Sequence, residues 1–262
     1  MIYDIRSYTL KPRSVPLVER MFAEAMPTRE KYSRLGAFFH TEVGPLNQIV
    51  HIWAYENSEQ MQRVRAEAAV DPSGMWPPKG LGEYMVIQSS ELVQPAPFME
   101  DWTGPQRLGE LYELRVYDLV PGSRGEVMKA WSSKIDGRRA YSPLAGCWLS
   151  AGFGGLGNKL YHLWAYDSFE HRARVRAKTS AAGVWPSRIA WGNSEKAAAW
   201  RSVIQWTSRS AALAGPSSSR RSIKLCSETA ADDRTMSTPI LPMGVRVPWA
   251  RPCPLECSNP ST

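Results

Sequence analysis

Apolar positions recur with two different spacings along this chain, and the order of the spacings predicts its strands and helices. Residues 2–10 alternate between apolar and polar side chains, as in a strand with one buried face. Ser14 is a suitable N-cap for a helix whose apolar stripe ends near Pro27. Residues 37–44 and 48–55 alternate again, residues 58–70 have helical spacing, and residues 82–93 form a last alternating stretch. The predicted order is strand, helix, strand, strand, helix, strand.

The same pattern occurs a second time, 109 to 111 residues later. The longest match joins VHIWAYENSEQMQRVRAE at Val50–Glu67 to YHLWAYDSFEHRARVRAK at Tyr161–Lys178. Shorter matches join IYDIRSYTLKP to LYELRVYDLVP at 2–12 and 111–121, and SGMWP to AGVWP at 73–77 and 182–186. Because solenoid repeats are much shorter, this is a duplicated domain.

Each repeat is predicted to be an α+β unit of the ferredoxin-like βαββαβ type, with two helices on one face of its sheet. The other face must be buried against something or remain in water. Two tandem repeats can bury their free faces against each other. We place the repeats at residues 1–98 and 110–186, with a linker at 99–109.

The second repeat stops matching the first directly after Trp185 and Pro186. We therefore predict that it lacks its last strand and leaves an open sheet edge along Leu111–Leu119. Residues 187–262 are rich in Ser, Arg, Ala and Pro, and allow a helix only around Glu195–Trp206. Two interpretations of this segment stay open, a disordered tail and a product of a shifted reading frame.

The net charge of +7 falls mostly in this last segment. Residues 187–262 hold 10 basic and 5 acidic residues, which leaves 22 basic and 20 acidic residues in the body. A nearly neutral body argues against nucleic-acid binding, which needs a basic face on the folded part. No apolar run approaches the roughly 20 residues of a membrane-spanning helix, and MIYDIRSYTL does not resemble a signal peptide. We expect a cytoplasmic protein.

Together these motifs resemble the NIPSNAP family of the dimeric α+β barrel superfamily. The resemblance rests on the opening Tyr-acid-hydrophobe-Arg-x-Tyr pattern, the His-hydrophobe-Trp-Ala-Tyr strand, the Arg-Val-Arg helix and the Trp-Pro after it, and it covers residues 1–98 and 110–186. It implies a barrel that binds a small molecule, as an enzyme of the cofactor-independent oxygenase or isomerase type or as a carrier. It equally allows a non-enzymatic scaffold or interaction protein, and we expect a homo-oligomer. Whether the chain is an enzyme stays open.

Strand alternation sorts the repeated residues into two faces. We assign the aliphatic Val50, Ile52 and Ala54 to the helix-covered face, and expect the polar and aromatic set to line the barrel interior. The candidate catalytic residues are His51 and His162. The candidate ligand-binding residues are Arg6, Tyr8, Trp53, Tyr55, Arg115, Tyr117, Trp164 and Tyr166. Trp76 and Trp185 are expected to supply apolar walls.

Two interpretations of the polar set stay open. Buried charges are costly unless paired, so Asp4 and Arg6, or residues of the two repeats, could form a salt bridge that only satisfies itself. Alternatively, Arg6 and Arg115 hold a small anionic or carbonyl-bearing ligand while a histidine moves a proton. The histidine spacing indicates no metal site, and no cofactor is expected. The helix arginines are expected to pair with acids on their own helix face: Arg63, Arg65, Arg174 and Arg176.

Overall fold

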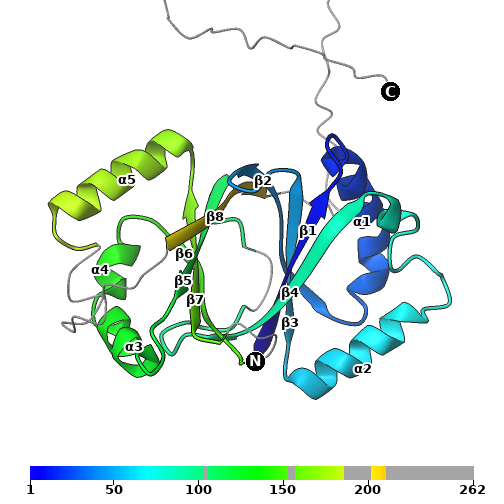
Figure 1. Ribbon diagram of the computed structural model, residues 1–262, viewed down its shortest axis with the longest axis horizontal. Coiled ribbons are helices and arrows are strands. Elements are labelled where there is room, and N and C mark those ends of the chain that lie inside the picture. Colours follow the sequence, from blue (N-terminus) through cyan, green and yellow to red (C-terminus); the bar gives the residue numbers. More distant parts are fainter. Residues whose placement is uncertain (103–105, 153–156, 186–201, 211–262) are drawn as a thin grey trace, which may run out of the picture. The chain divides into compact units, whose positions relative to one another are not determined.

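The computed structural model describes residues 1–102, 106–152 and 157–185 and the backbone of 202–210 (Figure 1). The chain divides into the units Met1–Ser217 and Ser218–Thr262, and every described element lies in the first. The first repeat contains β1 (Ile2–Leu10), α1 (Val15–Arg29), β2 (Arg34–Val43), β3 (Gln48–Tyr55), α2 (Ser58–Ala69), the short 3-10 helix η1 (Leu81–Glu83) and β4 (Met85–Pro95). The second contains β5 (Leu111–Asp118), α3 (Arg124–Ser132), α4 (Ile135–Arg139), β6 (Leu144–Ser150), β7 (Lys159–Tyr166), α5 (Phe169–Ala181) and β8 (Ser202–Ser210).

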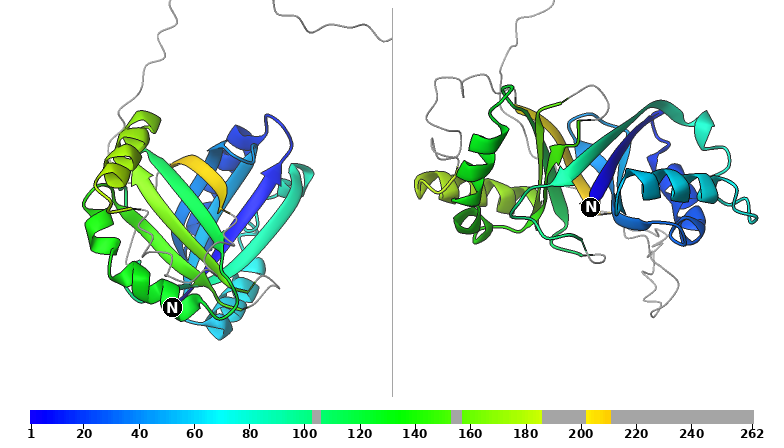
Figure 2. Two further views of the ribbon diagram at one scale, coloured as in Figure 1. Left: turned by 60° about the vertical axis from the view of Figure 1, so that its left-hand side comes forward. Right: turned by 90° about the horizontal axis from the view of Figure 1, so that it is seen from below.

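The eight described strands close into one barrel in the order β1-β3-β2-β8-β5-β7-β6-β4. Figure 2 shows these strands between two separate groups of helices, one from each repeat. The barrel closes because the last strand of each repeat also pairs with the other repeat: β4 of the first pairs with β6 of the second, and β8 of the second pairs with β2 of the first. The prediction of two ferredoxin-like repeats in a barrel is confirmed, and a single chain completes it. None of the described helices has the length and apolarity to cross a membrane.

The last strand of the second repeat is present, so the prediction that it is missing was wrong. β8 pairs antiparallel with β5 from Leu111 opposite Arg209 to Tyr117 opposite Ser202. The edge predicted to be open is therefore covered. Two sheet edges with unpaired N–H and C=O groups, on β5 and β2, accept this strand despite its polar composition. The C-terminal part of the helix expected at 195–206 is thus strand, and the rest of 187–262 lies outside the described residues.

Side-chain caps mark the start of two of the described helices, α2 and α5. The side chain of Asn57 accepts a hydrogen bond from the backbone N–H of Gln60 at 2.9 Å, which caps α2, and Ser168 caps α5 in the same way. Helix α1 continues to Arg29, past the predicted end near Pro27, because a proline in the last turn removes only one N–H donor. This extra length places the Arg29 side chain, only 3% exposed, inside the first repeat.

The barrel interior is packed with apolar side chains, and the predicted assignment of the two strand faces was wrong. Val50, Ile52 and Ala54 point into the barrel and not toward the helices. They belong to one buried cluster with residues of both repeats, namely Tyr3, Ile5, Phe39, Val93, Tyr112, Leu114, Val116, Ala145, Trp148, Tyr161, Leu163 and Ala165. Trp53 and Tyr55 instead pack with Phe22 and Met61 from the helices α1 and α2.

The two strand faces lie the opposite way round from the prediction for a physical reason. Both strand faces are rich in apolar residues, so alternation separates two sets without showing which set faces the helices. A closed barrel gives a buried charge little access to water, which makes charged groups there costly. Between sheet and helix, the same groups meet partners from the helices: Asp4 is bridged by Arg65 of α2, with 3.7 Å between Nη1 and Oδ2.

The linker between the repeats packs against the barrel interior through Trp102. Its ring makes edge contacts with Tyr3 and Trp148, with centroids 5.5 and 5.2 Å apart, and its indole N–H donates to the carbonyl of Ala145 at 2.7 Å. The backbone N–H of Trp102 donates to the Tyr3 hydroxyl at 3.0 Å. The linker is therefore part of the core that joins the two repeats.

Candidate functional site

A cavity of about 160 Å³ lies beneath α5, between this helix and the outer face of the sheet of the second repeat. A cavity of about 150 Å³ in a protein interior holds benzene, so the cavity suits a small molecule. Its lining is formed by Glu113, Arg115 and Tyr117 of β5, Arg138 of α4, His162, Trp164 and Tyr166 of β7, Arg176, Thr179 and Ser180 of α5, and Trp185. All five candidate residues of the second repeat meet here, outside the barrel.

Strand pairing explains why these residues meet. In the ladder between β5 and β7, Arg115 lies opposite His162 and Glu113 opposite Trp164. Paired residues project on the same side of a sheet, and every second residue of each strand shares that side. The first repeat repeats this arrangement with Arg6 opposite His51. Tyr8, Trp53 and Tyr55 complete the first-repeat set beneath its own helices.

The hydrogen bonds of His162 define its tautomer. The indole N–H of Trp164 can only donate, and it lies 2.7 Å from His162 Nδ1. Nδ1 is therefore the acceptor, and the proton of the neutral ring is on Nε2. Trp53 makes the same bond to His51 Nδ1 at 2.5 Å. Each histidine thus offers a neutral N–H donor from Nε2.

Burial and nearby arginines lower the pKa of both histidines well below the ordinary value, so both rings stay neutral in the folded chain. Unfolded histidines titrate near 6.5. Below about pH 6.5 the unfolded state binds protons that the folded state does not, so stability falls as pH falls. We expect each histidine to contribute up to about 1.4 kcal/mol per pH unit to this slope.

This pH dependence can be measured by urea denaturation at several pH values below neutral. Carboxylates also titrate in acid, so the wild-type chain should be compared with the double variant His51→Gln/His162→Gln. The variant should lose most of the slope between about pH 6.5 and 5.5. An unchanged slope would show that the two histidines are not buried in the neutral form.

Arg29 and Arg138 are buried residues beside the two sets of candidate residues, and the sequence analysis missed them. Arg138 donates to the Tyr166 hydroxyl at 3.2 Å and to Ser142 Oγ at 2.8 Å, and its guanidinium lies over the Trp164 ring, 4.0 Å from its centroid. Arg29 makes the equivalent contacts with Tyr55 and Trp53 in the first repeat. Burial lowers the pKa of both arginines. The pattern Arg-x-x-Tyr-Ser at 29–33 and 138–142 could have revealed them.

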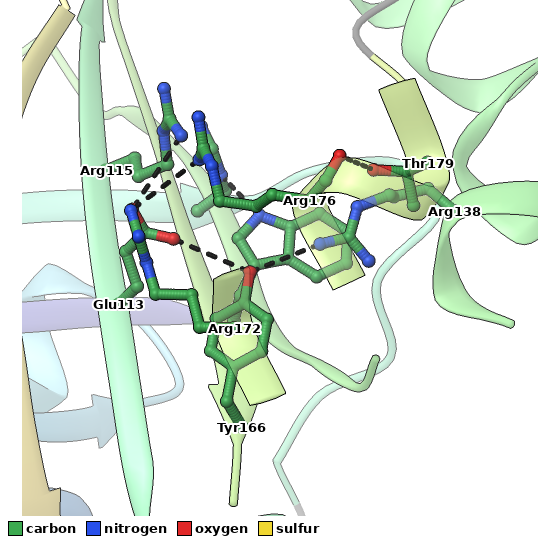
Figure 3. A network of polar contacts seen from close by, with 9 residues as sticks. Glu113, Arg115, Arg138, Tyr166, Arg172, Arg176 and Thr179 are labelled. Atoms are coloured by element: carbon green, nitrogen blue, oxygen red, sulfur yellow. Dashed lines mark hydrogen bonds and ion pairs between the residues drawn. The ribbon is translucent and has the colours of Figure 1, made fainter. Parts of the chain in front are cut away.

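Figure 3 shows the charged part of the second-repeat site, in which three arginines surround the Glu113 carboxylate. Arg172 donates to Glu113 Oε1 at 2.5 Å, whereas the Nη1 atoms of Arg115 and Arg176 lie 3.7 and 3.8 Å from the same oxygen. The Glu113 side chain is fully buried. In the first repeat, Asp4 pairs with Arg6 at 3.3 Å. The salt bridge between Asp4 and Arg6, one of the two interpretations of the polar set, is therefore present.

The helix arginines divide into two pairs. Arg63 and Arg174 bind Glu67 and Glu170 on their own helices, as predicted, at 3.4 and 2.5 Å. Arg65 and Arg176 lie two residues further along each helix, on another face, and reach the buried carboxylates of the sheet instead. For these two residues the expectation of a surface pair was wrong, because the strand face beneath the helix is the polar one.

Several buried nitrogen atoms of the described side chains have no hydrogen-bond partner. In the second repeat they include Nε2 of His162 and Nε of Arg138, both on residues that line the cavity. In the first repeat they include Nε2 of His51 and Nη1 of Arg29. Unpaired buried donors are rare in native proteins, and here they occur at equivalent positions of both repeats.

The sequence model of the NIPSNAP family matches residues 3–100 and 112–203. The chain belongs to the NIPSNAP family. The two matched segments correspond to the two repeats, and the second extends to the start of β8. In this NIPSNAP chain the matched segments thus include strands from both sides of the closed barrel.

Individual relatives match parts of the chain. Human Protein NipSnap homolog 3B is 42% identical over 84 residues, which cover 32% of this chain and 34% of the relative. The match thus spans about a third of the relative's length. The Protein NipSnap homolog of Dictyostelium discoideum is 25% identical over 192 residues, covering 72% of this chain and 80% of the relative. An uncharacterized NIPSNAP domain protein from Burkholderia xenovorans is 26% identical, with a TM-score of 0.37, over 38% of this chain and 100% of its own.

Proposed function

We propose that this NIPSNAP chain binds a small anionic or carbonyl-bearing molecule in the cavity of its second repeat. The observation that supports this most directly is the pair of unpartnered buried donors, His162 Nε2 and Arg138 Nε, on residues that line the cavity. An unsatisfied buried donor costs about 1–3 kcal/mol. A ligand oxygen that accepts from these groups would recover that energy.

The charges and walls of the cavity favour an anion. Arg115, Arg138 and Arg176 line it, against the single carboxylate of Glu113. The indole rings of Trp164 and Trp185 provide apolar surface, with centroids 6.3 Å apart. A few polar groups among aromatic walls are typical of a small-molecule site. The proposed site is beneath α5 and not inside the barrel, because apolar side chains fill the interior.

The chemistry available in the cavity favours binding over proton abstraction. An oxygenase or isomerase would need a base that accepts a proton from its substrate. His162 Nδ1 already accepts from Trp164, and Glu113 is held by Arg172. His162 can instead donate its Nε2 proton to a ligand carbonyl or carboxylate. A carrier, or an enzyme that polarises a carbonyl, fits this geometry better than an enzyme that starts by removing a proton.

A scaffold or interaction protein is the second candidate function. The packed barrel interior favours it, because the same apolar residues that fill the interior also join the two repeats into one core. In that case the buried arginines would serve the fold alone. The two functions differ in whether the second-repeat cavity takes up a ligand.

Native mass spectrometry of the full chain, followed by titration with benzoate, tests the binding function. We expect a bound mass or benzoate binding, and an affinity several times lower in Arg176→Met, because this partly exposed guanidinium contributes a solvent-screened charge to the cavity. Arg176 is 44% exposed on its side chain, so the variant should fold. Arg65→Met, the equivalent change in the first repeat, is the matched control and should leave binding unchanged. No bound mass and no benzoate binding would favour the scaffold.

A further inference from the structure

We propose that the second-repeat cavity selects a compact dianion, either a dicarboxylate or a phosphomonoester, and that Arg172 creates this selectivity. The inference rests on the proposed function and names the charge class of its ligand. It comes from a charged difference between the two sites, which are otherwise similar in their described residues.

Arg172 replaces an apolar residue of the first repeat. When the two helix sequences are aligned, EQMQRVRAE of α2 matches EHRARVRAK of α5. Arg172 therefore occupies the position that Met61 has in the first repeat. Met61 is buried in the apolar cluster beneath α2. Arg172 extends instead to the sheet and donates from Nη2 to Glu113 Oε1 at 2.5 Å. The second repeat has thus gained one positive charge at its buried carboxylate.

This extra charge changes which arginines neutralise the carboxylate. In the first repeat, Asp4 depends on Arg6 at 3.3 Å and on Arg65 at 3.7 Å, with a hydrogen bond from Ser90. In the second repeat, Arg172 takes the Glu113 carboxylate at the shorter distance, and Arg115 and Arg176 stay 3.7 and 3.8 Å away. The ion pair that neutralises Glu113 is therefore formed mainly with Arg172.

Arg172 is not among the described residues that line the cavity, whereas Arg115, Arg138 and Arg176 are. Once Glu113 and Arg172 are counted as a neutral pair, three guanidinium groups face the cavity without a matching anion. A monoanion would leave two of these charges uncompensated, and a dianion leaves one. Arg176 is 44% exposed, so solvent screens its charge. Two negative charges therefore match the two more buried guanidiniums, Arg115 and Arg138.

The geometry of the donors also suits a compact dianion. Guanidinium groups bind carboxylate and phosphate oxygens through paired N–H groups. The cavity of about 160 Å³ limits the ligand to a small head group with a short substituent. Like-charged arginines repel one another across such a space, and a ligand with oxygens at both ends or on one phosphorus would relieve this repulsion at several donors together.

The test is a calorimetric titration of the full chain at about pH 8, where a phosphomonoester is doubly charged. The probes are malonate and methyl phosphate as dianions, and acetate as the monoanion. We expect at least one dianion to bind about tenfold more tightly than acetate, as one further charge-assisted contact would give. The two dianions distinguish a dicarboxylate site from a phosphate site.

Two exchanged variants isolate the role of Arg172. Arg172→Met gives the second repeat the residue of the first, and should weaken dianion binding about tenfold while changing acetate binding little. Met61→Arg, the reverse change in the first repeat, should leave the second-repeat site unchanged. Arg172→Lys keeps the charge and should retain part of the preference, which separates a loss of charge from a loss of fold.

Three outcomes overturn the inference. Equal affinity for acetate and both dianions in the wild-type chain would do so, and this comparison needs no variant to fold. A preference that survives Arg172→Met would also do so. Either result, together with benzoate binding that depends on Arg176, would leave the proposed function standing. Absence of binding by benzoate and by all three anions would remove both.

Discussion

Glu113→Gln is expected to lower the free energy of unfolding by about 3 kcal/mol, because removing one partner of a buried ion pair leaves the other uncompensated. The Glu113 side chain is fully buried and meets the guanidinium groups of Arg172, Arg115 and Arg176. Gln has nearly the same shape but no charge, so three arginines would repel one another around it. Urea denaturation at neutral pH, followed by tryptophan fluorescence, measures the change.

Glu170→Gln is the matched control for this experiment. Glu170 also pairs with an arginine of α5, Arg174, at 2.5 Å, but its side chain is 80% exposed. Exposed pairs contribute little to stability, so this variant should unfold almost as the wild-type chain does. If both variants lose the same amount, the Glu113 cluster is not buried as described. Addition of malonate should not restore Glu113→Gln to wild-type stability, since the lost carboxylate also holds Arg172 in place.

Trp102→Ala should produce the second large effect, a loss of about 3 kcal/mol, at the lower end of the range for truncating a large aromatic side chain in a core. Trp102 fills the space between Tyr3 and Trp148 and bonds the Ala145 carbonyl. Its removal leaves a cavity at the contact between linker and barrel. Thermal unfolding monitored by circular dichroism would show a lower Tm.

A double-mutant cycle separates cavity formation from a general defect of the linker. A Cβ atom at Gly36 would collide with the Trp102 ring. Gly36→Ala alone should therefore destabilise the chain, whereas in the Trp102→Ala background it should cost much less, because the colliding ring is gone. Additive losses would contradict the described packing, since residues in contact are expected to couple.

The strands, helices and their duplication could be predicted from the sequence, because alternation and helical spacing depend on neighbouring residues. β3 was predicted at 48–55 and is found at Gln48–Tyr55, and α2 was predicted at 58–70 and is found at Ser58–Ala69. The orientation of the strand faces could not be obtained in this way. Val50 and His51 belong to opposite faces by alternation, but which one meets the helices depends on the tertiary packing of both repeats.

The sequence predicted the strand residues of the candidate site, but not the helix residues that reach it. His162 and Trp164 of β7 and Arg115 of β5 lie on one face of the sheet. The alternation of side chains along each strand reveals this directly. Arg138 reaches Trp164 from α4, and Arg172 reaches Glu113 from α5, across sequence separations that no local pattern encodes. Comparison of the repeats could have found Arg138 through its equivalent Arg29, but Arg172 has no arginine equivalent.

The pairing of β8 with both repeats has a consequence for synthesis of the chain on the ribosome. β2 ends at Val43, whereas its partner β8 begins only at Ser202. The backbone N–H and C=O groups on this edge of β2 therefore stay unpaired until most of the chain has been translated. One edge of β5 also stays unpaired until β8 has been synthesised. Such long-range pairing is slow and leaves strand edges open to other chains. Nascent chains that stop short of β8 should therefore depend most on chaperones during biosynthesis.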